Sequence, residues 1–171
     1  KTNRLVLANR VYDGMKGAWK NTKRQSLKKI QFRNAEMRLK PRNHPGFTEN
    51  NFKAKLVPGG NHWHQCLAAM GLSWLQRCER GQPVDLPVID FGPTQLLLLP
   101  GESYVEYQLA AQKMRPDSFV LVAGYGEGGT GYVPTEKHWE EKDGNLGDWC
   151  WVHPGAEKVM LKAIRKVLAP R

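Results

Sequence analysis

The chain has 171 residues, of which 40% are hydrophobic and 25% are charged, and its formal net charge is +10. This composition is typical of one globular domain and excludes a fibre or a disordered tail. No apolar run reaches the roughly 20 residues that a membrane-spanning helix needs, so no segment is expected to cross a bilayer. Three cysteines are too few for a disulfide scaffold and match no zinc-finger spacing, and Cys66 is expected to be a buried, inert thiol.

The positive charge is concentrated in the N-terminal third of the chain. Residues 1–58 carry 15 Lys and Arg against three acidic residues, whereas residues 59–171 have a net charge of −2. This basic region predicts contact with an anionic membrane surface, nucleic acid or an acidic partner, or with another segment of the same parent protein. Basic and aromatic residues do not alternate along the sequence as they do in proteins whose aromatic rings stack on bases. Nucleic acid is therefore the least favoured partner.

Hydrophobic periodicity divides the chain into helices and strands. Apolar residues at steps of three and four predict helices, and alternating or short continuous apolar runs predict strands. In chain order, the sequence predicts a helix over 3–20, a strand within 27–39, a short helix over 51–56, a helix over 61–80, strands over 84–89 and 95–99, a helix over 103–115, a strand over 119–123 and a helix over 154–168.

The segment from 95 to 123 has the length of a strand, a crossover helix and a second strand in parallel. The two strands are almost entirely apolar, so we expect helices on both of their faces. The fold class is therefore predicted as α/β, with a mixed, partly parallel sheet flanked by helices. No boundary divides the chain, so residues 1–171 are predicted to form one unit.

Two polar residues follow the parallel strands directly. Glu102 comes after the strand over 95–99, and Tyr132 comes after the glycine-rich stretch that follows the strand over 119–123. Open α/β sheets bind their ligands at the carboxyl ends of parallel strands, and both residues belong to that edge. We therefore expect Glu102 and Tyr132 to lie close together and to form the candidate site.

The stretch between them contains Gly124-x-Gly126-x-x-Gly129, the spacing of a dinucleotide-binding loop. That interpretation is rejected because Gly131 and Pro134 interrupt the helix that would have to receive the pyrophosphate. Glycines allow a backbone to pass close to a ligand or to another segment. Four glycines of this stretch are therefore predicted to contact a substrate or to let the loop pass close to another segment: Gly126, Gly128, Gly129 and Gly131.

The order of motifs resembles a known family. Leu99-Pro100-Gly101-Glu102, a helix, a buried strand, the run GYGEGGTGYVPT over 124–135 and an amphipathic C-terminal helix are similar to the second half of the catalytic domain of neutral ceramidases. The resemblance implies a zinc-dependent amide hydrolase that cleaves the N-acyl bond of ceramide or a related lipid. It also implies that Glu102 and Tyr132 are zinc ligands and that the parent protein is secreted or periplasmic.

The resemblance also implies what the chain lacks. In the family, two histidine ligands and the catalytic serine come from the first half of the domain, which would have to act as a second segment or chain. A tyrosine that supports the oxyanion usually follows the ligand tyrosine, and residues 142–149 contain none. We therefore expect the chain alone to be inactive. The alternative is a non-catalytic module that binds an anionic lipid surface or nucleic acid through the basic region.

Overall fold

The computed structural model describes residues 2–170, so Lys1 and Arg171, which belong to the predicted basic region and the predicted unit, lie outside the described residues. The elements, in chain order, are α1 (Thr2–Lys20), β1 (Gln31–Met37), η1 (Pro45–Phe47), α2 (Glu49–Lys55), α3 (His62–Glu79), β2 (Val84–Asp90), β3 (Thr94–Pro100), β4 (Glu102–Ser103), α4 (Val105–Met114), β5 (Phe119–Gly126), β6 (Tyr132–Val133), α5 (Glu136–Glu140), η2 (Gly144–Leu146) and α6 (Ala156–Leu168).

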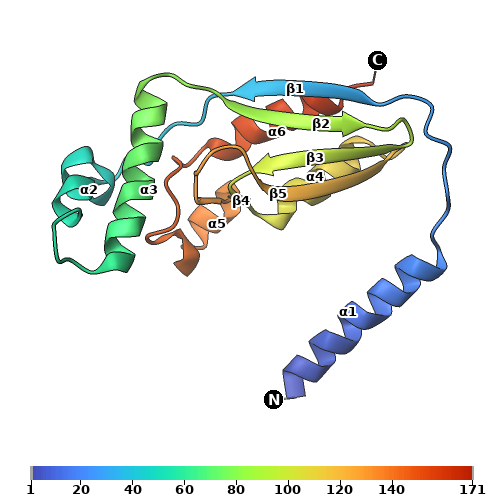
Figure 1. The fold of residues 1–171 in the computed structure, drawn as a ribbon, viewed down its shortest axis with the longest axis horizontal. Helices are drawn as coiled ribbons and strands as arrows, with labels where there is room; N and C mark the ends of the chain where they lie inside the picture. Colours follow the sequence, from blue (N-terminus) through green and yellow to red (C-terminus); the bar gives the residue numbers. More distant parts are fainter. Residues whose placement is uncertain (1, 171) are drawn as a thin grey trace.

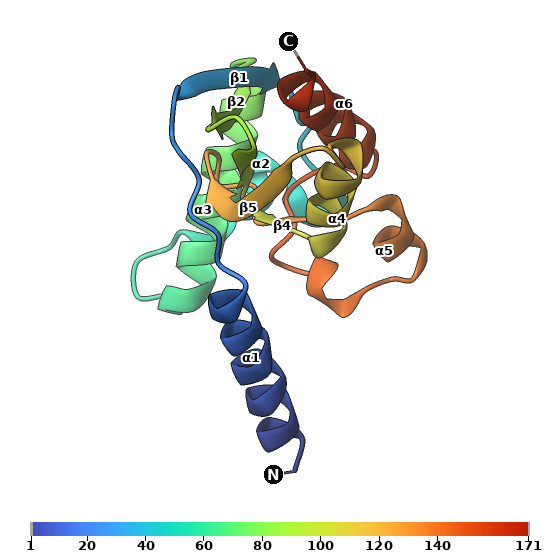
Figure 2. The ribbon, with the colours of Figure 1, turned by 90° about the vertical axis from the view of Figure 1, so that its right-hand side faces the viewer.

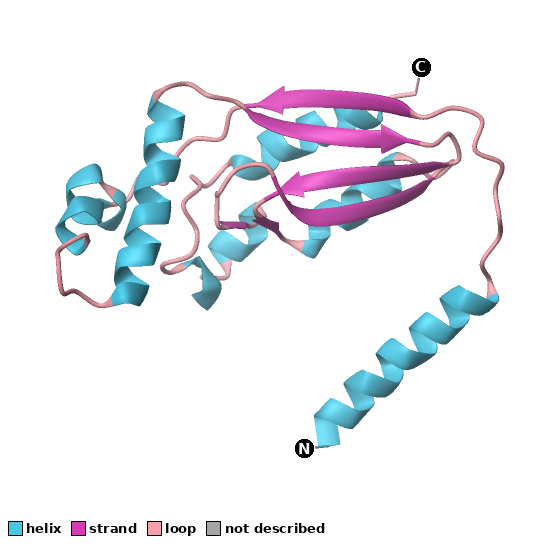
Figure 3. Ribbon diagram, in the orientation of Figure 1, coloured by secondary structure: helices cyan, strands magenta, loops and turns pink. Residues whose placement is uncertain are grey.

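The main sheet has the strand order β1-β2-β3-β5 (Figures 1 and 3). β1 pairs antiparallel with β2, and β2 pairs antiparallel with β3. β3 and β5 are parallel, and α4 connects them as the predicted crossover helix. The predicted fold class, a mixed and partly parallel sheet flanked by helices, is therefore confirmed.

Helices cover one face of this sheet. Figure 2 shows α4 and α6 on the same side of the strands. Side chains that point to this side are almost fully buried, among them Leu86, Leu97 and Val120, and they pack with Met160 and Ile164 of α6. The core of the molecule therefore lies between the sheet and these two helices.

The prediction that the parallel strands are covered on both faces is wrong. The burial of β3 and β5 alternates instead: the relative exposure of Phe119 is 66% and that of Leu121 is 44%, while Val120 between them is 2% exposed. A continuous apolar run shows only that both faces are apolar, because successive side chains of a strand point to opposite faces. In this chain no helix packs on the second face among the described residues.

The first helix is separate from the rest of the fold. α1 extends away from the sheet (Figures 1 and 2), and its apolar side chains are exposed, among them Leu5, Val11, Met15 and Trp19. The periodicity predicted this helix correctly, but no other element among the described residues packs on its apolar side. Over residues 2–170, no helix combines the length and hydrophobicity that crossing a membrane requires.

α3 packs closely on α2 and on the segment that contains Trp151. Gly71 packs so closely on Phe52 that a Cβ atom there would lie 2.6 Å from the Phe52 ring, and Trp74 donates a hydrogen bond from Nε1 to the Trp151 carbonyl over 3.0 Å. Cys66 lies on the outer side of α3 and is exposed, so its predicted burial is wrong.

Candidate active site

A short parallel ladder joins the two predicted site residues. β4 pairs with β6, and Glu102 is the direct partner of Tyr132 in the register. Side chains at matching positions of paired strands point to the same side of the sheet. Both residues are half-buried. The prediction that the topology brings Glu102 and Tyr132 together is confirmed, although the ladder itself, only two residues long in each strand, was not predicted.

Two glycines allow this ladder to form. Gly101, with φ at 49°, turns the chain from β3 into β4, and Gly131, with φ at 64°, precedes β6. A Cβ atom on Gly131 would lie 1.9 Å from the carbonyl oxygen of Trp149, and one on Gly101 would lie 1.9 Å from Oγ1 of Thr130. L-residues rarely adopt this left-handed backbone, so glycine is required at both positions for conformation and for space.

The other predicted loop glycines differ in their surroundings. A Cβ atom on Gly126 would lie 2.8 Å from the Leu99 carbonyl oxygen, and one on Gly128 would touch Val84 at 3.4 Å. Gly126, Gly128 and Gly131 therefore pass close to other segments of the chain. A Cβ atom on Gly129 would meet nothing within 4 Å. A contact between these glycines and a substrate stays a prediction.

The loop over 127–131 is fixed to the body of the fold by one carboxylate. Glu127 forms an ion pair with Arg77 of α3 and accepts a hydrogen bond from the backbone N–H of Asp85 over 2.7 Å. The backbone N–H of Glu102 donates to the Gly131 carbonyl over 2.9 Å. The position of Tyr132 relative to Glu102 is thus set by contacts from α3, β2 and β4.

A third oxygen belongs to this site and was missed in the sequence. Tyr125 has a left-handed backbone, with φ at 58°, where the register of β3 and β5 shifts, and it is 73% exposed. The nearby Glu102 carboxylate raises the pKa of the Tyr125 phenol, and the backbone N–H of Tyr125 donates to the Gly101 carbonyl, next to Glu102, over 2.8 Å. The sequence could not reveal this contact, because the direction of the side chain depends on a strained residue.

Aromatic and polar contacts hold the other side of Tyr132. The ring of Tyr104 meets that of Tyr132 edge-on at a centroid distance of 5.9 Å, and the Tyr104 hydroxyl donates to Oδ2 of Asp143 over 2.8 Å. Burial raises the pKa of Tyr104, and the Asp143 contact adds to that shift. The pKa of Asp143 is lowered, first by the backbone N–H of Asn145 and then by Tyr104. Tyr104 is therefore a neutral donor that orients Tyr132.

The described residues do not complete a zinc site. A catalytic zinc takes about three protein ligands, mostly histidine nitrogen or carboxylate oxygen. Among residues 2–170, no group of three or more His, Cys, Asp or Glu side chains is placed to hold a metal ion. Glu102 and Tyr132 offer two oxygen atoms, and His62 and His64 are exposed at the start of α3. The chain by itself does not fit zinc.

Comparison with solved structures gives matches to ceramidases. A ceramidase complexed with C2 matches with a TM-score of 0.51 and 14% identity over 82% of this chain and 30% of that one. The neutral ceramidase of Pseudomonas aeruginosa matches with a TM-score of 0.51 and 16% identity over 82% of this chain and 28% of that one. The chain has the fold of part of a neutral ceramidase.

The resemblance read from the motifs is thus confirmed at the level of the fold. At 14% and 16% identity, the likeness says nothing of the activity of this chain. No family model matches the sequence, and no curated protein does. The chain spans less than a third of the length of these two ceramidases.

Proposed function

We propose that the chain is part of a ceramidase-like, zinc-dependent amide hydrolase that acts on ceramide or a related N-acyl lipid. The observation that carries this proposal is the register of β4 and β6, which pairs Glu102 with Tyr132 at the carboxyl ends of β3 and β5 in a chain with the fold of part of a ceramidase. Glu102 and Tyr132 provide two of the metal ligands, and the missing half of the domain provides the rest.

In such a site, bound zinc would polarise the amide carbonyl and lower the pKa of a water molecule. The residues of this chain have separate tasks. Glu102 and Tyr132 are paired in the ladder and would hold the metal, Tyr104 contacts the Tyr132 ring edge-on, and Tyr125 is tied by its backbone N–H to Gly101 beside Glu102. The Tyr125 phenol is exposed, so it is a further hydrogen-bond donor available to a substrate carbonyl.

The proposal predicts different behaviour for this chain and for a longer ceramidase-like polypeptide that contains it. The 171-residue chain should not hydrolyse a fluorescent short-chain ceramide, with or without added zinc, and should bind zinc weakly in calorimetric titration because it offers two oxygen ligands. The longer polypeptide should hydrolyse the substrate, lose activity in a chelator and regain it with zinc. Zinc-dependent turnover by the short chain would contradict the division of the site.

A second candidate function is binding to an anionic membrane surface, and α1 favours it. Leu5, Leu7, Val11, Met15 and Trp19 lie on one exposed side of the helix. Lys20 lies on the opposite side and Lys16 at the edge of the apolar side, over the Tyr12 ring, and residues 1–30 contain nine Lys and Arg against Asp13 alone. A basic amphipathic helix of this kind lies in the plane of a membrane interface, which is where a ceramide-like substrate would be.

Vesicle binding tests this second function. The chain should bind vesicles that contain phosphatidylserine at about 0.05 M salt and be largely released at about 0.5 M, because screening shortens the range of the attraction. The K16Q/K20Q variant should bind more weakly, and neutral vesicles should bind little. Co-sedimentation measures the bound fraction. Equal binding to neutral and anionic vesicles, or binding unaffected by salt, would rule out an electrostatic role for the basic region.

A further inference from the structure

The second face of the main sheet has an apolar row that crosses all four strands. Phe32 of β1 is paired with Ile89 of β2, Ile89 with Leu96 of β3, and Leu96 with Leu121 of β5. Directly paired residues point to the same side of a sheet, so these four side chains form one continuous row on the face opposite α4 and α6. This row, together with Phe119, is called the open face below.

The open face is unlike an ordinary solvent-facing sheet. Phe32 is 71% exposed, Phe119 is 66% exposed and Leu121 is 44% exposed, and Ile89 and Leu96 are half-buried. Sheets that face water normally alternate apolar and polar residues, with the polar residues outward. A contiguous exposed apolar patch on a folded protein usually marks an interaction surface. The open face therefore indicates a binding surface for an apolar partner.

The residues along the open face do not favour an anionic partner. The row itself contains no charged side chain, and the paired residues Glu36 and Asp85, further along β1 and β2, are acidic. The four residues of the row therefore offer no cation to the phosphate groups of lipids or nucleic acids. The basic residues of the chain lie mainly in residues 1–58, and those before β1 belong to α1 and its linker. An apolar protein surface fits this face better than a membrane or a nucleic acid.

We propose that the open face is the docking surface for the remaining part of a longer ceramidase-like chain, which binds to it through an apolar surface of its own. This inference rests on the proposed function, and two observations select the occupant. The chain spans 28–30% of the two solved ceramidases, so most of such a protein has no counterpart here. Tyr125, near the carboxyl end of β5, donates its backbone N–H to the Gly101 carbonyl beside Glu102, so a segment that binds the open face also reaches the candidate site.

The test is a double substitution, Phe32→Thr with Leu121→Thr, which removes both apolar side chains and places a β-branched residue with high strand propensity at each position. In the 171-residue chain it should leave the melting temperature within about 2 °C, because both side chains are exposed, and should reduce binding of a hydrophobic dye. In a longer polypeptide that contains the chain, it should lower the melting temperature by roughly 5–10 °C, because the same side chains are buried there. Leu109→Gln, on the exposed side of α4, is the control. It should leave the melting temperatures of the short chain and of the longer polypeptide unchanged.

Three outcomes would overturn the inference. An unchanged melting temperature of the longer polypeptide would show that the remainder does not cover this face. An equal loss in the short chain would show that Phe32 and Leu121 already pack inside it. A dimer of the short chain that the double variant converts to a monomer, measured by light scattering, would make a second copy the occupant. Because these readouts are stability and mass, they stay informative even if the polypeptide binds no zinc.

Discussion

Glu102→Gln is expected to abolish most of the activity of a longer ceramidase-like polypeptide that contains this chain. The amide has the shape of the carboxylate but lacks its charge, so it binds zinc far more weakly. Replacing a residue that only hydrogen-bonds to a metal ligand lowers metal affinity or activity by roughly 10- to 100-fold. Because Glu102 is proposed as a ligand itself, we expect a loss of at least about 100-fold in kcat/KM and in zinc affinity. Steady-state kinetics with a fluorescent ceramide and zinc titration measure the two values.

The same substitution should hardly change the melting temperature. Glu102 is half-buried in a two-residue strand, and its backbone contacts do not depend on the side-chain charge. Glu36→Gln, an equal change of charge on the exposed side of β1, is the control and should retain full activity. Tyr132→Phe should reduce zinc affinity while preserving the ring contact with Tyr104. Full zinc-dependent hydrolysis by the double variant of Glu102 and Tyr132 would show that neither residue is a ligand.

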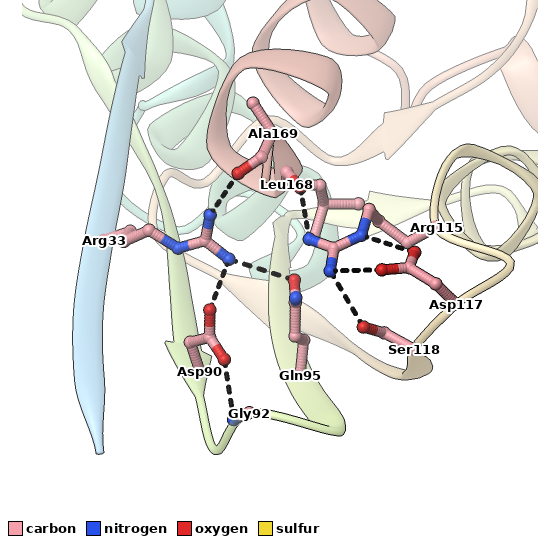
Figure 4. A network of polar contacts seen from close by, with 9 residues as sticks. All are labelled: Arg33, Asp90, Gly92, Gln95, Arg115, Asp117, Ser118, Leu168 and Ala169. Atoms are coloured by element: carbon pink, nitrogen blue, oxygen red, sulfur yellow. Dashed lines mark hydrogen bonds and ion pairs between the residues drawn. The ribbon is translucent and has the colours of Figure 1, made fainter. Parts of the chain in front are cut away.

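The largest effect on stability is expected at the opposite end of the sheet, where a polar network surrounds the end of α6 (Figure 4). Arg33 of β1 donates to the Ala169 carbonyl over 2.8 Å, to Gln95 over 3.1 Å and to Asp90 over 2.9 Å. Arg115 donates to the Leu168 carbonyl over 2.7 Å. The two arginines satisfy the free carbonyls at the end of α6 and complement its negative helix end.

Arg33→Met should lower the free energy of unfolding by about 3 kcal/mol, because it leaves Asp90 and the buried Gln95 without their partner. For a domain of this size the melting temperature should fall by roughly 6–12 °C. Thermal unfolding followed by circular dichroism gives both quantities. Arg10→Met removes the same charge from exposed α1 and should shift the melting temperature by less than about 2 °C. Similar shifts for both variants would mean that the network does not hold α6.

Much of the fold was predictable because it follows from local periodicity. The helices over 3–20, 61–80 and 103–115 and the crossover between β3 and β5 were predicted from apolar spacing, with ends that differ by a few residues. The last helix begins at Ala156 rather than at Pro154, because Gly155 takes a left-handed backbone, with φ at 94°. Such shifts at helix ends arise from cap geometry, which periodicity does not encode.

The remaining features depend on contacts between distant segments. The ladder of β4 and β6 requires Gly131 to approach Trp149, and the role of Tyr125 requires a strained backbone. The short helix α5 has too few residues for a periodic pattern. The sequence could place Glu102 and Tyr132 at one edge of the sheet, because both follow parallel strands. It could not show which face of the strands stays open, since both faces are apolar.

The two ends of the sheet have different tasks. At the amino ends of β3 and β5, Arg33 and Arg115 fasten the last helix with charged contacts. At the carboxyl ends, Glu102 and Tyr132 directly follow glycine turns at Gly101 and Gly131. A substitution near the reacting groups can therefore alter the chemistry without loosening the last helix, and a substitution in the arginine network can weaken the fold without touching a ligand. Such a scaffold can change its substrate over evolution while it keeps its shape.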